Sequence, residues 1–382
     1  MIKFDFSTYL NIDEINYNNI ELINKFDSDN NAKFIKEEVS FEELERIKKI
    51  SNKIKSNSDV LLIIGIGGSY MGSYAIKKIF EKIYEKSGVE LIYIGSTLST
   101  KYIEQTLDYI SDKDISVNVI SKTGETLETK LVYNLVKELM AKKYTDDELK
   151  ERIVITTGKN NGLLYNEVLS NNYTFLEFKN EVSGRYSLMT CAHLLPLSVL
   201  GIDIEDFIKG YKEGLNLKEK ALEYASIRYS LFNNKKYIEN FVIYEEELYY
   251  YTEWLKQLFA ESEGKNNKGI LPISSINTRD LHSLGQFIED GNNIIFETVI
   301  NVVIDNELNR INNIISNSVS KTHSKSNTPN LVITLDNLSI YNIGMLSAFF
   351  MLSAIFSSYL FGVNPFDQPG VELYKNQIKE DL

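Results

Sequence analysis

Cysteine and histidine are scarce in this sequence. Cys191 is the single cysteine among 382 residues, so no intramolecular disulfide can form, and a reducing compartment such as the cytoplasm is expected. The three histidines, His193, His282 and His323, are scattered, and no spacing of His, Cys and carboxylate residues resembles a ligand set. The scarcity therefore argues against a bound metal, and we expect no cofactor.

An excess of positive charge is also absent. Asp and Glu number 53 against 41 Lys and Arg, which gives a formal net charge of −12. An acidic surface disfavours nucleic acid and anionic membranes as partners. A phosphorylated ligand would therefore have to be held by local groups, such as the backbone N–H groups at a helix N-terminus.

Neither a signal peptide nor a membrane span is expected. The residues from Met1 to Asp5 are too mixed in charge and too short in apolar run for a signal peptide. Residues 345–363 carry no charged side chain and are long enough to span a bilayer, yet they include four serines. Neither end has a Lys or Arg close by. We predict a buried core or subunit-interface helix there.

Two regions of the chain show apolar runs that alternate with helical patterns, as parallel sheets covered by helices do. The first predicts strands over 60–64, 91–94, 115–120 and 153–156, with helices over 69–86 and 126–142. The second predicts strands over 240–244, 294–303 and 331–334, with a helix over 248–260. Residues 189–220 are expected to be mostly helical, with His193 in the core. The polar stretch 316–330, with His323, is expected to be an exposed loop.

These patterns predict an α/β fold with two doubly wound parallel sheets. The expected divisions are an N-terminal helical arm over 1–44, a first domain over 45–190, a helical connector over 191–237, a second domain over 238–340 and a C-terminal helical segment over 341–382.

A glycine-rich turn from Gly65 to Ser69 follows the first predicted strand and opens a helix. Its backbone N–H groups could hold a phosphate or a sugar hydroxyl, or the turn could be tight and bind nothing. A dinucleotide fingerprint needs a third glycine where Tyr70 stands, and the Gly-Lys-Ser/Thr of a P-loop is missing. Nucleotide binding is therefore disfavoured.

A hydroxyl-rich loop opens a second predicted helix in the same way. Ser121, Lys122, Thr123 and Thr126 are its candidate phosphate ligands, because hydroxyls and free helix N–H groups suit a phosphate monoester. The alternative is an ordinary capped helix, since Ser and Thr favour N-caps. Glu125 would repel a phosphate and must point outward. This arrangement is similar to that of sugar isomerase (SIS) domains, which include both isomerases and regulatory sugar-phosphate sensors.

Four further segments carry candidate acid–base residues, over 180–187, 260–265, 278–286 and 364–375. Together with the two turns they resemble the phosphoglucose isomerase (glucose-6-phosphate isomerase) family, over about residues 60–376 and in the family's order. The matching motifs are Gly-Ile-Gly-Gly-Ser, Ser-Lys-Thr-Gly, Gly-Arg-Tyr-Ser, Glu-Ser-Glu-Gly-Lys, Asp-Leu-His-Ser-Leu-Gly-Gln and Asn-Pro-Phe-Asp-Gln-Pro-Gly-Val-Glu. The last three are highly specific.

The resemblance implies two SIS domains and reversible conversion of glucose 6-phosphate to fructose 6-phosphate through a cis-enediol, without a metal. Glu261 would be the base and Arg185 the cation beside the enediolate. His282 would open the sugar ring with help from Lys375, and Glu128 would orient the imidazole. Gly68, Ser69 and Gln368 would contact the sugar. The resemblance also implies a homodimer with shared active sites, in which the histidine comes from the neighbouring subunit.

Each candidate has an ordinary interpretation when taken alone. Glu261 could be a solvated helix-end acid, and Glu263 two residues later is equally acidic.

Two other functions stay open. A non-catalytic sugar-phosphate sensor would need the Ser121 loop but would have no use for the acid–base residues together. A related isomerase could act on another phosphosugar, such as mannose 6-phosphate.

Overall fold

The computed structural model describes residues 2–10, 20–84, 88–160 and 162–382. The chain divides into two compact units. The continuous unit is Glu37–Ile204, and the discontinuous unit joins Met1–Lys36 to Glu205–Leu382. Each unit contains one five-stranded sheet, so the expectation of an α/β fold with two mainly parallel sheets is confirmed.

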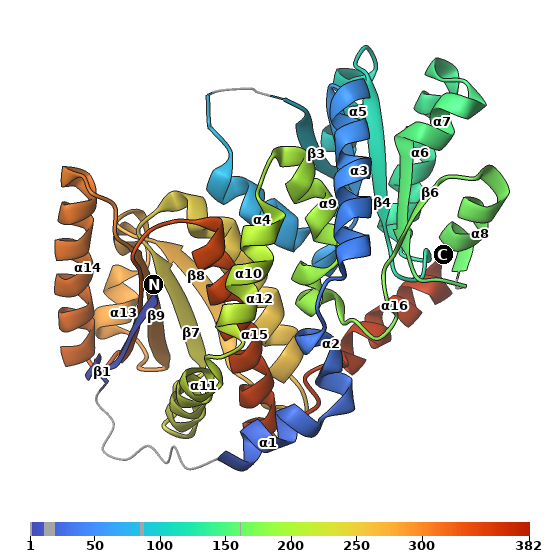
Figure 1. The fold of residues 1–382 in the computed structure, drawn as a ribbon. Helices are drawn as coiled ribbons and strands as arrows, with labels where there is room; N and C mark the ends of the chain where they lie inside the picture. The colour runs from blue at the N-terminus through green and yellow to red at the C-terminus, as the bar shows by residue number, and fades with distance from the viewer. Residues whose placement is uncertain (1, 11–19, 85–87, 161) are drawn as a thin grey trace. The chain divides into compact units, whose positions relative to one another are not determined.

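The sheet of the continuous unit is parallel throughout, in the order β3-β2-β4-β5-β6. Figure 1 labels β3, β4 and β6 of this sheet. Its strands are β2 Val60–Ile64, β3 Glu90–Ile94, β4 Ile115–Ile120, β5 Ile153–Thr157 and β6 Thr174–Glu177. The helices are α3 Phe41–Asn57, α4 Met71–Phe80, α5 Thr100–Ile110, α6 Leu127–Lys143, α7 Asp146–Arg152, α8 Gly162–Asn171 and α9 Cys191–Leu200. Strands β2, β4 and β5 are buried along their whole length, which explains their uninterrupted apolar runs.

The sheet of the discontinuous unit has the order β1-β10-β9-β7-β8, with β1 antiparallel at one edge. Its strands are β1 Ile2–Tyr9, β7 Ile238–Ile243, β8 Leu271–Ile276, β9 Ile295–Val302 and β10 Asn330–Leu335. The helices are α1 Ile20–Ser28, α2 Lys33–Lys36, α10 Ile204–Gly214, α11 Lys218–Asn233, α12 Tyr249–Glu263, α13 Gly285–Asp290, α14 Glu307–Lys325, α15 Ile340–Phe361 and α16 Pro369–Asp381.

Helix α15 is the apolar helix that by length and composition could cross a membrane. In the structure 89% of its most apolar window is buried inside the protein. It packs against α11 and α12, and its Gly344 lets the helix approach the backbone of α10 at Phe207. The prediction of a buried core helix is therefore confirmed.

The structure differs from several local predictions. The stretch 316–330 was predicted as an exposed loop, and that is wrong, because α14 extends to Lys325 and β10 begins at Asn330. The buried face of α14 is itself polar, and Ser316 donates a hydrogen bond to Asn301 on β9 at 3.0 Å. Because α14 buries polar side chains against polar residues of a strand, its amino-acid composition is that of a loop. His323 is consequently buried in a helix and is not in a loop.

Other differences concern where the predicted elements end and which elements were not predicted. Residues 2–9 of the expected N-terminal arm form β1, and the helix expected over 69–86 ends as α4 at Phe80, with 85–87 outside the described residues. Strands β6 and β8 were not predicted. The helices of the expected connector divide between the units, with α9 in one and α11 in the other.

Candidate functional site

The glycine turn and the hydroxyl loop follow adjacent parallel strands. Strand β2 pairs with β3 on one side and with β4 on the other, so the strand order reverses between β2 and β4. Ligands of doubly wound sheets bind beyond the carboxyl ends of the strands at such a switch point. The turn after Ile64 and the loop after Ile120 both begin at this edge.

The glycine turn lies directly against the segment that carries Arg185. Gly67–Ser69 forms one short 3-10 helix, and Gly184–Met189 forms another. A Cβ atom on Gly68 would stand 2.2 Å from the carbonyl carbon of Gly184, so only glycine permits this approach. The turn therefore does more than connect β2 to α4, because it places Gly68 and Ser69 beside Arg185.

Arg185 is an almost fully buried cation. Its side chain is 1% exposed, and its guanidinium carbon lies 5.5 Å from the ring centroid of Tyr186. Burying a guanidinium costs several kcal/mol unless anionic or hydrogen-bonding groups compensate it. Arg185 is therefore held inside the continuous unit, next to the glycine turn.

Two hydroxyls of the loop lie together at the start of α6. The Ser121 and Thr126 hydroxyl oxygens are 3.2 Å apart, and the Gly124 N–H donates to the Ser121 hydroxyl at 3.1 Å. Thr126 occupies the N-cap position, yet its side chain makes no capping hydrogen bond. The ordinary capped-helix interpretation is therefore weakened at this residue, and the Thr126 hydroxyl faces its neighbour Ser121.

Lys122 and Glu125 are placed differently from the hydroxyls. The Lys122 ammonium donates to the carbonyls of Asn180 at 2.8 Å and Val182 at 3.0 Å, which ties the loop to the turn before Gly184. Burial lowers the pKa of Lys122, against the opposing effect of Glu181. Glu125 and Thr123 are exposed, while Glu128 in the first turn of α6 is half-buried.

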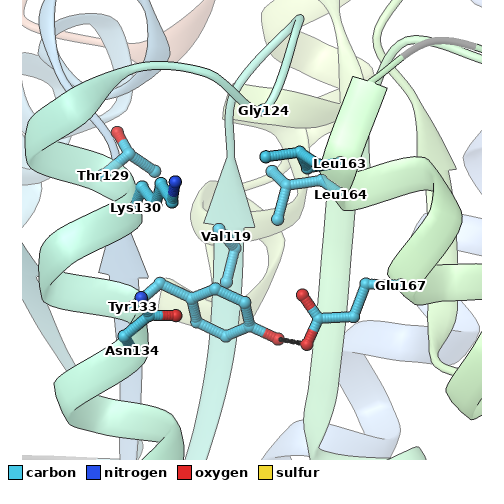
Figure 2. A pocket seen from close by; sticks show the side chains of 9 residues that line it. All are labelled: Val119, Gly124, Thr129, Lys130, Tyr133, Asn134, Leu163, Leu164 and Glu167. Carbon is cyan, nitrogen blue, oxygen red and sulfur yellow. Dashed lines mark hydrogen bonds between the residues drawn. The ribbon is translucent and has the colours of Figure 1, made fainter.

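The loop rests on α8 around a small cavity of about 140 Å³, and Figure 2 shows its lining. Gly124 has a φ of +74°, and a Cβ atom there would lie 2.9 Å from the backbone nitrogen of Leu164. The Thr129 hydroxyl is buried in this region without a hydrogen-bond partner. Thr129 therefore lines the cavity and makes no hydrogen bond to the Ser121 or Thr126 hydroxyl.

In the discontinuous unit, the two candidate bases at the end of α12 have different surroundings. Glu263 is fully buried, and Arg228 donates to both of its oxygens, at 2.8 and 2.9 Å. The Ser357 hydroxyl donates to Oε2 at 2.6 Å, and the Ile270 N–H donates to Oε1 at 3.1 Å. Glu261 is half-buried and accepts from Gln257 at 3.1 Å. Only Glu261 of this pair is accessible to a substrate.

Arg228 also connects Glu263 to the sheet. Its Nε donates to Glu239 of β7 at 2.8 Å, and Glu239 accepts a bond from Thr298 of β9 at 2.7 Å. Burial alone would lower the pKa of Arg228, but the carboxylates of Glu239 and Glu263 outweigh that effect and raise it. The end of α12 is therefore fixed to the sheet by a buried charged cluster.

His282 lies on an exposed turn after β8, the 3-10 helix Arg279–His282. Asp280 anchors this turn, because its Oδ2 accepts from the Ile276 N–H at 2.8 Å and from Arg279 at 2.9 Å. The imidazole of His282 is thus presented to the outside of its own unit by a fixed backbone.

The two motifs that carry Glu261 and Gln368 are brought together within the discontinuous unit. Lys265 forms an ion pair with Asp367 at 2.9 Å, and it also donates to the Asn364 carbonyl. Gln368 is the N-cap residue of α16. Lys375 on α16 is exposed and pairs with Glu372 at 3.5 Å.

The predicted site residues therefore fall into two sets. The continuous unit holds Gly68, Ser69, Ser121, Lys122, Thr123, Thr126, Glu128 and Arg185, and the discontinuous unit holds Glu261, His282, Gln368 and Lys375. Sequence reasoning missed Arg228, and it assigned His193 only to the core. Across the described ranges, no three His, Cys, Asp or Glu side chains are grouped so that they could hold a metal ion.

Two doubly wound sheets, a hydroxyl-rich loop at a switch point and an accessible carboxylate beside a buried one define a protein of the phosphosugar isomerase class. A sequence model described as Phosphoglucose isomerase matches residues 39–324. The chain belongs to the phosphoglucose isomerase family, and the predicted resemblance is confirmed.

Relatives and solved structures agree with this membership. A glucose-6-phosphate isomerase of Acetivibrio thermocellus is 41% identical, and the match covers 88% of this chain and 83% of the relative. One from Caldanaerobacter subterraneus subsp. tengcongensis is 39% identical, with 88% and 82% covered. A crystal structure of a hypothetical protein from Thermus thermophilus shares the fold, with a TM-score of 0.81, 21% identity, and 95% and 93% of the chains covered. A glucose-6-phosphate isomerase structure from Chlamydia trachomatis has a TM-score of 0.76 at 21% identity, with 89% and 72% covered.

Proposed function

We propose that this protein interconverts glucose 6-phosphate and fructose 6-phosphate, the hexose phosphate isomerisation shared by glycolysis and gluconeogenesis. Its family and its relatives' activity support the reaction. The observation that carries the proposal is the contrast at the end of α12, where Glu263 is saturated by hydrogen bonds and Glu261 is not buried. A proton-transfer enzyme needs one accessible carboxylate that is held in place.

The substrate phosphate binds at the start of α6. The hydroxyls of Ser121, Thr123 and Thr126 and the helix N–H groups donate to its oxygens. Lys122 contributes its backbone N–H, because its ammonium is occupied by two carbonyls. The exposed position of Glu125 is compatible with a phosphate in this place, since its carboxylate can turn to solvent.

The reaction begins with ring opening. His282 and Lys375 move a proton between the C1 hydroxyl and the ring oxygen, and Glu128 orients the imidazole. Gly68, Ser69 and Gln368 hold the sugar. Glu128 lies in the continuous unit, whereas His282, Lys375 and Gln368 lie in the discontinuous unit. A homodimer with shared active sites, in which His282 comes from the neighbouring subunit, would assemble them.

Glu261 then carries out the isomerisation. It removes the proton from C2 of the open aldose, and the electrons form a cis-enediolate with the oxygen at C1. The Arg185 guanidinium stabilises that negative charge. The proton of the C2 hydroxyl passes to the oxygen at C1, and return of the abstracted proton to C1 then completes the ketose and regenerates the carboxylate. No step in this scheme needs a cofactor, and the protein would work in the cytoplasm.

A coupled assay of glucose 6-phosphate turnover on the purified protein, without added metal and with a chelator present, tests the proposal. Glu261→Gln should reduce kcat by at least about 10³-fold while fructose 6-phosphate still binds, because only the base is lost. Glu247→Gln is the matched control, since it removes an exposed acid shortly before α12. A wild-type protein that binds the substrate without turning it over would instead be a sugar-phosphate sensor.

A further inference from the structure

His193 occupies a hydrogen-bonded position between three segments of the continuous unit. It lies on α9 and is 1% exposed. Its Nδ1 is 3.0 Å from the Ser73 backbone nitrogen on α4. Its Nε2 is 2.8 Å from the Gly68 carbonyl oxygen and 3.0 Å from the Ser187 hydroxyl. Gly68 belongs to the glycine turn, and Ser187 belongs to the segment of Arg185.

The partners determine the tautomer of the imidazole. A backbone N–H can only donate, so Nδ1 must accept from Ser73, and the ring proton is therefore on Nε2. Nε2 then donates to the Gly68 carbonyl. The single proton of the Ser187 hydroxyl is shared between the same carbonyl, at 3.0 Å, and the Gly184 carbonyl, at 2.6 Å. One side chain thus joins α4, the glycine turn and the Arg185 segment.

The Nδ1 bond also replaces a missing helix cap. Helix α4 begins at Met71, and its N-cap residue Tyr70 makes no side-chain capping bond. Ser73 is at the third position, whose N–H an N-cap side chain normally satisfies. Gly72 leaves room for the ring, because a Cβ atom there would be 3.1 Å from Cε1 of His193. His193 caps α4 from outside the helix.

We propose that His193 is a positioning residue for the isomerase site, a role that rests on the proposed function. It holds the Gly68 carbonyl, and through Ser187 the turn of Arg185, so that the sugar-contacting turn and the guanidinium keep one fixed separation. The two ring nitrogens have separate duties. Nδ1 stabilises the N-terminus of α4, and Nε2 fixes the position of the Gly68 carbonyl at the site.

Because the two ring nitrogens of His193 have different partners, separate variants can distinguish a positioning role from a purely structural one. In His193→Asn, the amide oxygen can take the place of Nδ1, but the side chain is too short to reach Gly68. In His193→Gln, the amide nitrogen can reach the Gly68 carbonyl, but nothing caps Ser73. A merely structural histidine would lose activity in proportion to stability in both variants.

The experiment measures Tm, kcat and KM for fructose 6-phosphate in wild type, His193→Asn and His193→Gln. We expect the Asn variant to keep a Tm near that of wild type while kcat/KM falls roughly 10- to 100-fold, since a misplacement of about 1 Å can cost that much. The Gln variant should lose more Tm and keep kcat/KM within about 3-fold. Equal kcat/KM in both variants, or activity that follows Tm, would overturn the proposal.

Two further measurements keep the test decisive. Ser187→Ala removes the second donor to the Gly68 carbonyl and should lower kcat in the same direction as His193→Asn. If a His193 variant does not fold, wild-type kcat in Ser187→Ala contradicts the proposal by itself. If wild type binds fructose 6-phosphate without turnover, the proposed function fails, and calorimetric affinity replaces kcat/KM as the measure of His193, with a loss again expected in the Asn variant alone.

Discussion

His193 in the continuous unit and His323 in the discontinuous unit are equally hidden from solvent, at 1% and 3% exposed, but their partners differ in charge. His193 bonds to the backbone of Ser73 and Gly68 and to the Ser187 hydroxyl. Burial lowers its pKa to about 4, against a smaller opposing effect of the Gly68 carbonyl. It is neutral at physiological pH.

His323 has carboxylates as partners. Its Nδ1 is 2.7 Å from Oε2 of Glu297, and its Nε2 is 3.7 Å from Oε1 of Glu289. Burial alone would lower its pKa, but the bond to Glu297 and the two carboxylate charges raise it. Burial therefore does not determine the charge of a histidine, because the neighbouring charges can outweigh it.

The same contrast holds for the two parts of the candidate site. The continuous unit fixes its turns by hydrogen bonds to backbone carbonyls from His193, the Ser187 hydroxyl and the Lys122 ammonium. The discontinuous unit fixes Glu263 by an ion cluster with Arg228 and Glu239. The ion cluster distinguishes the structural carboxylate of Glu263 from the accessible one of Glu261.

The largest expected effect comes from removing the cation of that cluster. Arg228→Met leaves Glu239 and Glu263 buried without their partner, and the free energy of unfolding should fall by about 3–5 kcal/mol. Urea denaturation at pH 7 measures it. Lys48→Met, which breaks an exposed pair with Glu45, is the control. A loss for Arg228→Met as small as that of the control would contradict the ion-cluster account.

His193 should make the protein less stable in acid. Its folded pKa of about 4 lies below its ordinary value of 6.5, so between these values the unfolded state binds more protons than the folded state. The free energy of unfolding then falls as the pH is lowered, by at most about 1.4 kcal/mol per pH unit. Urea denaturation from pH 7 to pH 4.5 should show a shallower pH dependence in His193→Asn than in wild type. Identical slopes would contradict a neutral His193.

His323 should act in the opposite direction. Its folded pKa is raised above 6.5, so its contribution to stability is complete below that pH and is lost as the pH rises through the folded pKa. His323→Asn should therefore remove a decline in stability as the pH rises above 6.5. The same denaturation series measures it, and a wild-type decline that persists unchanged in the variant would exclude His323 as its source.

Glu125 should have the smallest effect. Its side chain is exposed at the rim of the hydroxyl loop, where water and salt screen its charge. Glu125→Gln should change the KM for fructose 6-phosphate by less than about 2-fold at physiological salt. Steady-state kinetics at two salt concentrations tests this. A tenfold fall in KM would mean that the carboxylate faces the phosphate.

The sequence predicted well those elements that bury apolar side chains, and it missed a helix that buries polar ones. The buried strands β2, β4 and β5 were located closely, because parallel strands covered on both faces leave uninterrupted apolar runs. Helix α14 was missed, since its buried face carries Ser316, Ser320 and His323 and lies over polar strand residues. Amphipathic periodicity cannot reveal a helix whose inner face is polar.

The candidate site was predictable only in part. Glu261 was selected by the order of its motifs, while its type and helix-end position were shared with Glu263. The physical difference between the two depends on Arg228, 35 residues before Glu263 in the chain, and on Ser357 in α15. His193 likewise gained its partners from segments more than 100 residues away in the chain, at Gly68 and Ser73. Neither set of contacts has a local sequence signal.

The assignment of Glu261 as the proton-transferring base is tested most directly by deuterium incorporation. Fructose 6-phosphate is incubated in D₂O with wild type, Glu261→Gln or the Glu247→Gln control, and deuterium at C2 of the glucose 6-phosphate is followed by NMR. We predict incorporation with wild type and the control, and none with folded Glu261→Gln that still binds substrate. Incorporation by Glu261→Gln at the wild-type rate would contradict the account.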